Sequence, residues 1–261
     1  MDAATFSVES ADAFAEFQQP LDRSGHYTVK HTFCPPGAIP LWVADMDLPI
    51  DPKIHAAIME RAAHPTFGYT IQPPELWEAV ARWLRVEHGW HVRPDQLIFT
   101  SNLVSATVNA LRAFTKPGDA VAVVRPLYTP LQTLVVGSGR RLVSVDAGPG
   151  ASAESPLALD LAALRAALAA ERVAALIWCS PHNPSGRVWT RSELRAVATM
   201  CKELGVFIIS DEIHCDLVLW GHVHTPMALA CVENPDVGIP TTVTFRANPT
   251  HHLTRSPSHV I

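Results

Sequence analysis

The chain has 261 residues, 48% of them hydrophobic, and its 20 Lys and Arg against 25 Asp and Glu give a net charge of −5. A chain of this length can bury a large core, as one α/β domain or as one domain with an appendage. The charges form no long run of one sign, so the sequence lacks the basic footprint of proteins that bind nucleic acids or anionic membranes. Small-molecule chemistry is the class that remains favoured.

The cysteines and the N-terminus indicate a reducing compartment. The five cysteines are an odd number without CxxC spacing, which argues against a disulfide scaffold and a thiolate zinc site. Residues 1–16 have no basic start and no apolar core, so they do not resemble a secretory signal. No apolar run approaches the roughly 18 residues that a membrane span needs. We therefore expect reduced thiols and a cytoplasmic location.

The first 50 residues are rich in proline, so no long helix is expected after residue 20. We predict that residues 1–50 form an N-terminal arm with a portion of a small domain, in which Leu41–Asp47 is a turn. Two helices should follow, opened by Pro52 and Pro74. In the second helix Leu76, Val80 and Leu84 recur at helical spacing and should face a core.

Strand and helix patterns alternate after this region. The predicted strands are Leu97–Thr100, Ala120–Val124, Leu142–Val145, Val173–Cys179, Val206–Ile209 and Thr241–Phe245. The clearest predicted helices are Leu103–Phe114 and the segment that a Thr190/Glu193 capping box opens and Gly205 closes. This alternation is typical of an α/β fold, a mostly parallel sheet with helices packed on it.

Polar residues follow several of these strands. The apolar run Val206–Ile209 leads into Asp211, where ligands collect in open α/β sheets, so Asp211 should meet a cationic group of a ligand. The alternative is that Asp211 only caps the next turn. Three further loops occupy equivalent positions: Thr100–Val104 at a helix start, Pro126–Tyr128, and Ser180–Gly186 with its two prolines.

Taken together, these loops resemble the fold-type I pyridoxal-phosphate enzymes of the aminotransferase class I/II superfamily. Within it, Phe67–Tyr69, Asn183–Thr190 and Ser210–His214 look like the MalY/PatB-type cysteine-S-conjugate (cystathionine) β-lyases. The resemblance implies a three-layer α/β/α fold of the PLP-dependent transferase type and a homodimer. It also implies cleavage of a small amino-acid thioether, an L-cysteine conjugate or cystathionine, to a thiol, pyruvate and ammonia.

The resemblance assigns four residues to the ring of pyridoxal 5′-phosphate. Asp211 pairs with the protonated pyridine nitrogen, which makes the ring an electron sink. Asn183 donates to the phenolic oxygen, and Tyr128 stacks on the ring. His214 lies one turn of chain beyond Asp211, where a supporting role is expected.

The resemblance assigns another set of residues to the cofactor phosphate. Backbone N–H groups of Asn102, Leu103 and Val104 bind it at the start of a helix. Tyr69 reaches the phosphate of the neighbouring subunit.

One family feature is missing from this sequence. The family's Schiff-base lysine follows the strand here read as Thr241–Phe245, but the chain continues with Arg246 and its only lysines are Lys30, Lys53, Lys116 and Lys202. The resemblance thus gives no catalytic residue in this chain. It implies an incomplete cofactor-binding domain over residues 51–245, a non-family tail over 246–261 and an absent C-terminal small domain.

The abrupt loss of resemblance after Phe245 suggests a truncation or frameshift. We expect the shortened chain to be inactive, to leave one sheet edge uncovered and to carry His251 and His252 in a solvated tail.

Three other functions are compatible with parts of the sequence. An aminotransferase would share every residue named for the lyase, although Ile213-His214 and the Phe67–Tyr69 loop favour the lyase. A non-catalytic regulator of the same fold would explain the missing lysine. Acids and histidines between 211 and 224 suggest a metal hydrolase, but HExxH and repeated ligand spacing are absent, so no metal site is expected.

Overall fold

The computed structural model describes residues 21–23, 25–150, 157–219, 221–232, 242–248 and 250–255, the last two ranges by their backbone alone. The chain packs as two compact units, residues 1–71 and 72–261. Residues 1–20 of the predicted arm lie outside the described part. The boundaries that the family resemblance implies, at residues 50 and 245, differ from this division and stay predictions. In the described residues, every helix is too short or too polar to cross a bilayer.

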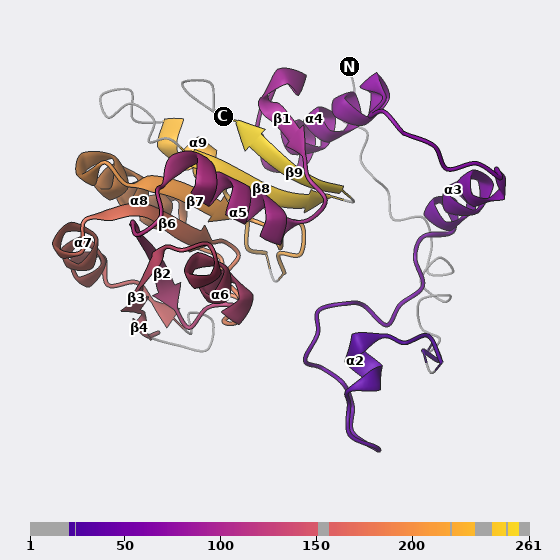
Figure 1. Ribbon diagram of the computed structural model, residues 1–261, viewed down its shortest axis with the longest axis horizontal. Helices are drawn as coiled ribbons and strands as arrows, with labels where there is room; N and C mark the ends of the chain where they lie inside the picture. The colour runs from indigo at the N-terminus through magenta and orange to yellow at the C-terminus, as the bar shows by residue number, and fades with distance from the viewer. Residues whose placement is uncertain are drawn as a thin grey trace. The chain divides into compact units, whose positions relative to one another are not determined.

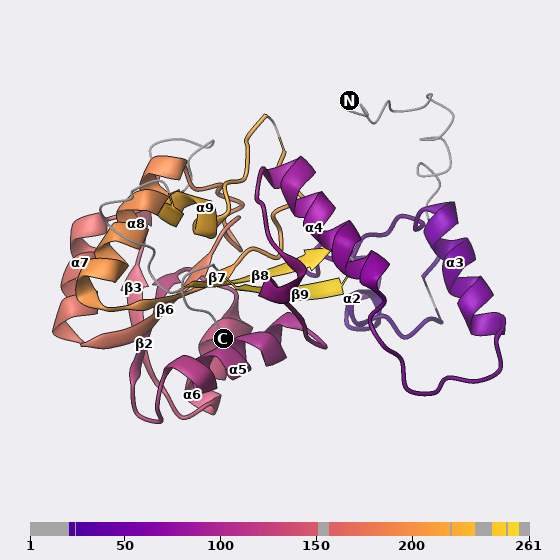
Figure 2. The same ribbon diagram turned by 90° about the horizontal axis from the view of Figure 1, so that it is seen from above.

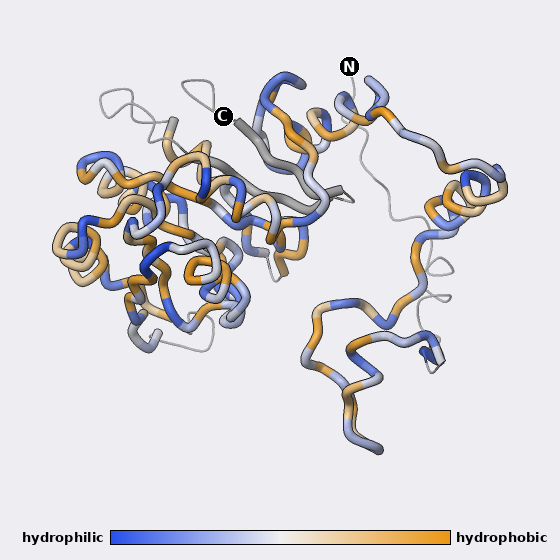
Figure 3. Tube along the Cα trace, in the orientation of Figure 1, coloured by the Kyte–Doolittle hydropathy of each residue, from blue (hydrophilic) through white to orange (hydrophobic). Residues whose placement is uncertain are grey.

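The first unit contains α2 (Val29–Thr32) and α3 (Pro52–Ala63) in its described part. Helix α3 opens at Pro52 as predicted, and Asp51 caps it by accepting a hydrogen bond from the Lys53 N–H (2.7 Å). None of its residues is buried. Hydrophobic residues recur along this unit (Figure 3), so much apolar surface is left exposed on it.

Ion pairs hold the segment Leu41–Asp47, which contains neither helix nor strand. Asp47 pairs with Lys30 (2.7 Å), His31 (2.9 Å) and Arg23 (2.6 Å). Hydrogen bonds from these three groups hold the pKa of the Asp47 carboxyl well below its usual range, and the bond from Lys30 has the largest effect. The predicted turn therefore ends in a firmly ionised carboxylate.

The second unit is built on a seven-stranded sheet in its described residues, with the strand order β1-β9-β8-β7-β6-β2-β3 (Figure 1). Strand β9 runs antiparallel to both its neighbours, and the other paired strands are parallel. The strands are β1 (Leu97–Phe99), β2 (Ala120–Arg125), β3 (Arg141–Asp146), β6 (Val173–Cys179), β7 (Phe207–Asp211), β8 (Thr242–Asn248) and β9 (Thr250–Arg255). A separate small sheet pairs β4 (Gly148–Pro149) with β5 (Leu157–Ala158).

Helices cover both faces of this sheet, which Figure 2 shows edge-on, with α7, α8 and α9 on one side and α5 and α6 on the other. The predicted α/β/α arrangement is confirmed. The helical segments of the second unit are α4 (Pro74–His88), the 3-10 turn η2 (Pro94–Gln96), α5 (Leu103–Phe114), α6 (Thr129–Gly137), α7 (Leu161–Ala170), α8 (Arg191–Leu204) and α9 (Met227–Val232).

The alternation of side chains along β2 shows how the core is divided. Ala122 and Val124 face the cluster that includes α7 and α8, whereas Val121 and Val123 face the cluster under α5 and α6. These four residues of β2 are all buried, as expected for a parallel strand covered on both faces. Each fully buried valine side chain stabilises the fold by about 1.5–3 kcal/mol.

Local sequence signals place several helix ends correctly. Helix α5 spans Leu103–Phe114, as its apolar spacing predicts. The predicted capping box is present, with Thr190 and Glu193 bonding each other's backbone N–H, and Gly205 ends α8 at φ 69°. In α4, Val80 and Leu84 are buried in a small cluster with Trp90, as predicted.

The C-terminal segment differs from the prediction. Thr250–Arg255 does not form a solvated tail but the strand β9, so the backbone of His251 and His252 lies within the sheet between β8 and β1. The edge of β8 is therefore paired with β9, and in the described residues the sheet ends at β1 instead. The physical reason is that an open strand edge offers a row of backbone donors and acceptors that almost any extended segment can satisfy.

Candidate functional site

Asp211 is the last residue of β7, and only 3% of its surface is exposed. Its carbonyl oxygen accepts a hydrogen bond from the Ser180 N–H (2.9 Å), and its carboxylate accepts one from the Ile213 N–H (3.2 Å). The turn-capping alternative is thus present in the structure as well. Burial raises the pKa of Asp211 to about 7, the Glu212 charge adds to this, and the Ile213 bond opposes it.

The loop after β6 is fixed against the end of β7. Cys179 lies directly opposite Asp211 in the strand register, and its Sγ accepts a hydrogen bond from the Asn183 N–H (3.4 Å). Its carbonyl oxygen accepts a bond from the Trp189 indole (2.9 Å). The peptide bonds preceding Pro181 and Pro184 are cis. Asn183 is half-buried at this position.

A direct contact joins this loop to the one after β2. The Tyr128 N–H donates to the carbonyl oxygen of Asn183 (3.2 Å). Tyr128 occupies the N-cap position of α6, and 45% of its surface is exposed. The ends of β2, β6 and β7 therefore converge, which brings the backbones of Tyr128, Asn183 and Asp211 into one connected set.

The start of α5 lies in the same region. Leu103 is buried in the apolar cluster that also contains Leu127 and Cys179 and against which Ile213 packs. Asn102 caps the helix by accepting a hydrogen bond from the Ser105 N–H (2.8 Å). The first N–H groups of a helix have no partner within it, so this end can bind an anion.

Val104 and His214 complete the residues predicted in this unit. Val104 is exposed on the first turn of α5. His214 lies half-buried in the turn after β7, where burial lowers its pKa.

Tyr69 belongs to the first unit and its side chain is fully exposed. Its contact with the phosphate of a neighbouring subunit stays a prediction.

Sequence reasoning missed the role of Glu212, which is fully buried beside Asp211. Its carboxylate accepts hydrogen bonds from the Ser210 hydroxyl (2.9 Å) and the Met227 N–H (2.8 Å), and it pairs with His224 Nε2 (2.9 Å). These bonds connect the end of β7 to the segment leading into α9. The sequence around Glu212 gave no signal of this role, because its partners His224 and Met227 lie 12 and 15 residues away in the chain.

The family model for aminotransferase class I and II matches residues 38–245. The chain belongs to this family. The match covers both the first unit from residue 38 and the region where the strand ends converge.

The chain is similar to the cystathionine beta-lyase PatB of Bacillus subtilis (strain 168), with 40% identity over 202 residues. That match covers 77% of this chain and 51% of PatB. Protein MalY of Escherichia coli (strain K12) is 29% identical over 217 residues, which are 81% of this chain and 55% of MalY. The chain spans about half the length of the curated relatives it matches.

A solved structure supports the fold. Cystalysin from Treponema denticola, whose crystal structure contains a pyridoxal 5′-phosphate cofactor, superposes with a TM-score of 0.81 and 27% identity. The match covers 92% of this chain and 64% of that one. The resemblance on which the sequence analysis relied is therefore confirmed at the level of family and fold.

Proposed function

We propose that this chain carries the cofactor-binding region of a pyridoxal-phosphate-dependent carbon–sulfur β-lyase. The observation that carries the proposal is the buried Asp211 carboxyl, with a pKa near 7, at the point where three strand ends converge. The similarity to PatB and MalY supports the lyase, and the cofactor of cystalysin supports pyridoxal phosphate.

The residues of the chain fit this cofactor. Among the described residues, the groups that set the pKa of Asp211 include no cation, so a buried carboxyl here faces a deficit of positive charge. A protonated pyridine nitrogen would supply that charge and bring the carboxyl back to its ionised form. The backbones of Asn183 and Tyr128 are hydrogen-bonded to each other, which supports a role for both residues beside the ring, and the start of α5 suits a phosphate.

The cofactor, when bound, draws electrons from the substrate Cα, so that a proton can leave this carbon and a thiolate can leave the next one. The part of Asp211 is to hold a proton at the ring nitrogen. Asn183 orients the phenolic oxygen, Tyr128 shields one face of the ring from water, and the α5 N–H groups hold the phosphate. None of these residues can serve as the base at Cα, the role that the family gives to a lysine.

Arg246 lies within β8, and the sequence has no lysine in this strand or after it. We therefore propose that the chain by itself binds the cofactor reversibly and does not turn substrate over. The substrate class is a small amino-acid thioether, the assembly a homodimer and the compartment the cytoplasm. The exposed apolar residues of the first unit, among them Ile54, Ile58 and Phe67, are consistent with a partner subunit.

Cofactor binding by the chain tests the site. Titration with pyridoxal phosphate, followed by its absorbance, should show reversible binding that Asp211→Asn weakens by roughly 10- to 100-fold, since a charge-assisted hydrogen bond is lost. Asn183→Ala should weaken binding less. The matched control Asp95→Asn, at an exposed carboxylate, should bind as the parent chain does. Equal affinity of the parent and Asp211→Asn would contradict the site.

Borohydride reduction of the complex is the complementary measurement. We expect no specific lysine to be labelled, because Lys30 is buried in the ion pairs of the first unit and the chain has only three others. Stoichiometric labelling of one lysine would show that this chain has its own covalent attachment point.

The aminotransferase alternative shares the same site, and its reaction distinguishes it. A full-length relative should release pyruvate and ammonia from a cysteine conjugate and exchange keto acids poorly. The opposite pattern would favour the aminotransferase.

The frameshift hypothesis and the regulator alternative make their own predictions. A lysine-bearing continuation in another reading frame of the coding DNA downstream of Phe245 would support a frameshift. A regulator of the same fold would engage a protein partner in pull-down while binding pyridoxal phosphate only weakly.

A further inference from the structure

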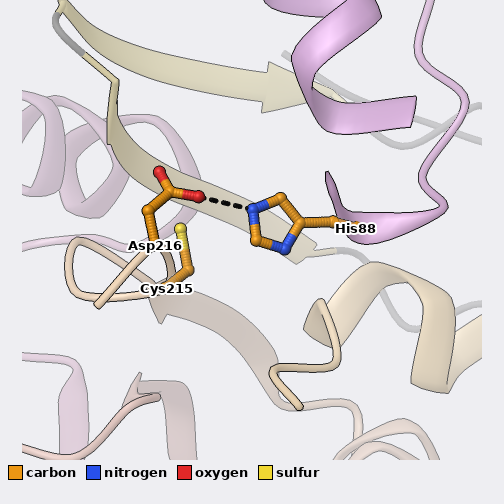
Figure 4. Close-up of side chains that lie close together, drawn as sticks. All are labelled: His88, Cys215 and Asp216. Atoms are coloured by element: carbon orange, nitrogen blue, oxygen red, sulfur yellow. Dashed lines mark hydrogen bonds and ion pairs between the residues drawn. The ribbon is translucent and has the colours of Figure 1, made fainter. Parts of the chain in front are cut away.

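Three side chains from two distant parts of the sequence come together in the second unit. His88 is the last residue of α4, whereas Cys215 and Asp216 belong to the turn after β7. Their ligand atoms, an imidazole nitrogen, the Cys215 Sγ and an Asp216 carboxylate oxygen, all lie within 4.8 Å of one another. Figure 4 shows the His88 ring directed at the Asp216 carboxylate, with the Cys215 sulfur beside it.

We propose that His88, Cys215 and Asp216 form a binding site for a divalent transition-metal ion of the zinc class. Thiolate, imidazole and carboxylate are the three side-chain ligands that zinc takes in proteins, and the thiolate disfavours magnesium and calcium. Two ligand atoms of a tetrahedral zinc ion lie roughly 3.5 Å apart, given bond lengths of about 2.0–2.3 Å. The three groups therefore need to shift by about an ångström or less to share one ion.

The supporting elements hold the three ligands close to this arrangement. Helix α4 is anchored by Val80 and Leu84, which pack in one cluster with Ala228 of α9. The turn is closed by a hydrogen bond from the Cys215 N–H to the Glu212 carbonyl oxygen (3.0 Å). A site that rests on a packed helix and a closed turn loses little conformational entropy when an ion binds.

The surroundings also suit an ion with an open fourth position. Cys215 is buried, whereas the Asp216 side chain keeps 24% of its surface exposed, so solvent reaches the site in part on its carboxylate side. The His224 ring packs edge-on against His88, with 5.7 Å between ring centroids. Its Nδ1 is buried and has no hydrogen-bond partner among the described residues, and a metal-bound water is a suitable partner for it.

Without metal, the same groups form a polar clamp between α4 and the turn. His88 Nε2 lies 2.6 Å from Asp216 Oδ1, which also accepts a hydrogen bond from the Trp83 indole (3.1 Å). An ion would replace the His88–Asp216 contact, and Cys215 would release its thiol proton to solvent as it binds. The proposal does not depend on pyridoxal phosphate, so it can fail while the proposed function stands.

Cobalt(II) and zinc(II), each added alone to the purified chain, test the site. We expect one cobalt per chain with a thiolate-to-cobalt charge-transfer band, and zinc should displace the cobalt. Cys215→Ser should abolish this band, and His88→Gln and Asp216→Asn should weaken zinc binding by tenfold or more. The controls Cys34→Ser and His222→Gln, at a thiol and an exposed imidazole elsewhere, should retain the band and the affinity.

A stability readout separates lost binding from lost folding. Saturating zinc should raise the thermal midpoint of the parent chain and of both controls, and it should leave that of Cys215→Ser unchanged. Far-ultraviolet circular dichroism shows whether each variant is folded. Absence of a charge-transfer band in the folded parent, or its persistence in Cys215→Ser, would overturn the proposal.

Discussion

Replacing Asp211 by asparagine should change how the stability of the chain depends on pH. The native state holds the Asp211 carboxyl with a pKa of about 7, against 3.8 for a free aspartate. Between these two values the unfolded chain has lost the proton while the native chain keeps it. Because the native state binds more protons in this window, the free energy of unfolding falls as the pH rises from about 4 to 7.

The size of the effect follows from the pKa difference. A shift of 7 − 3.8, or 3.2 units, corresponds to about 4 kcal/mol of unfolding free energy at 1.36 kcal/mol per unit. The whole penalty is present above pH 7, and little of it remains below pH 4. Asparagine does not ionise, so the free energy of unfolding of Asp211→Asn lacks this penalty. Its difference from that of the parent chain should therefore grow steadily between pH 4 and 7.

Urea unfolding at several pH values from 5 to 8 measures this difference, followed by the fluorescence of the buried Trp178 and Trp189. An amide at this position changes the free energy of unfolding by the same amount at every pH. The test is therefore how the difference between Asp211→Asn and the parent chain changes with pH. Asp95→Asn is the matched control, because Arg93 lowers the pKa of Asp95 and its ionisation is complete above pH 5. Parallel curves for the parent chain and Asp211→Asn would refute the reasoning.

Three other predictions concern stability and reactivity. Glu212→Gln should destabilise the chain by roughly 3 kcal/mol in urea unfolding, since a buried charge-assisted network with His224 is disrupted, and a loss below about 1 kcal/mol would contradict this role. Thr190→Ala should cost about 1 kcal/mol through loss of the α8 cap, and Thr190→Ser should restore most of it. In the folded chain at pH 8 a thiol reagent should modify Cys34 and spare the buried Cys201, whose pKa burial raises to about 12. Rapid labelling of Cys201 before urea is added would contradict that placement.

Much of the second unit could be predicted because its signals are local. The apolar run Val206–Ile209 favours a strand covered on both faces, and β7 is buried throughout. The Thr190 capping box and Gly205 mark the ends of α8 through contacts within one turn of chain. The loop motifs around Asn183 and Asp211 led to the family, which the match over residues 38–245 confirms.

The C-terminal strand shows where local signals end. Residues 246–261 have no apolar period, which favours a tail over a strand or helix. Whether Thr250–Arg255 forms a strand depends on the open edges of β8 and β1, which no pattern within those six residues can indicate. Long-range pairing decided this element.

The sequence by itself determined the alternation of strands and helices, the family, and which polar residues follow which strand. Only the tertiary structure decided that Asp211 is desolvated enough for a pKa near 7, that Glu212 is held by His224, and that His88 of α4 meets Cys215 and Asp216. The physical reason is that periodicity and capping act over a few residues, whereas burial and side-chain contact depend on segments folded together from distant parts of the chain.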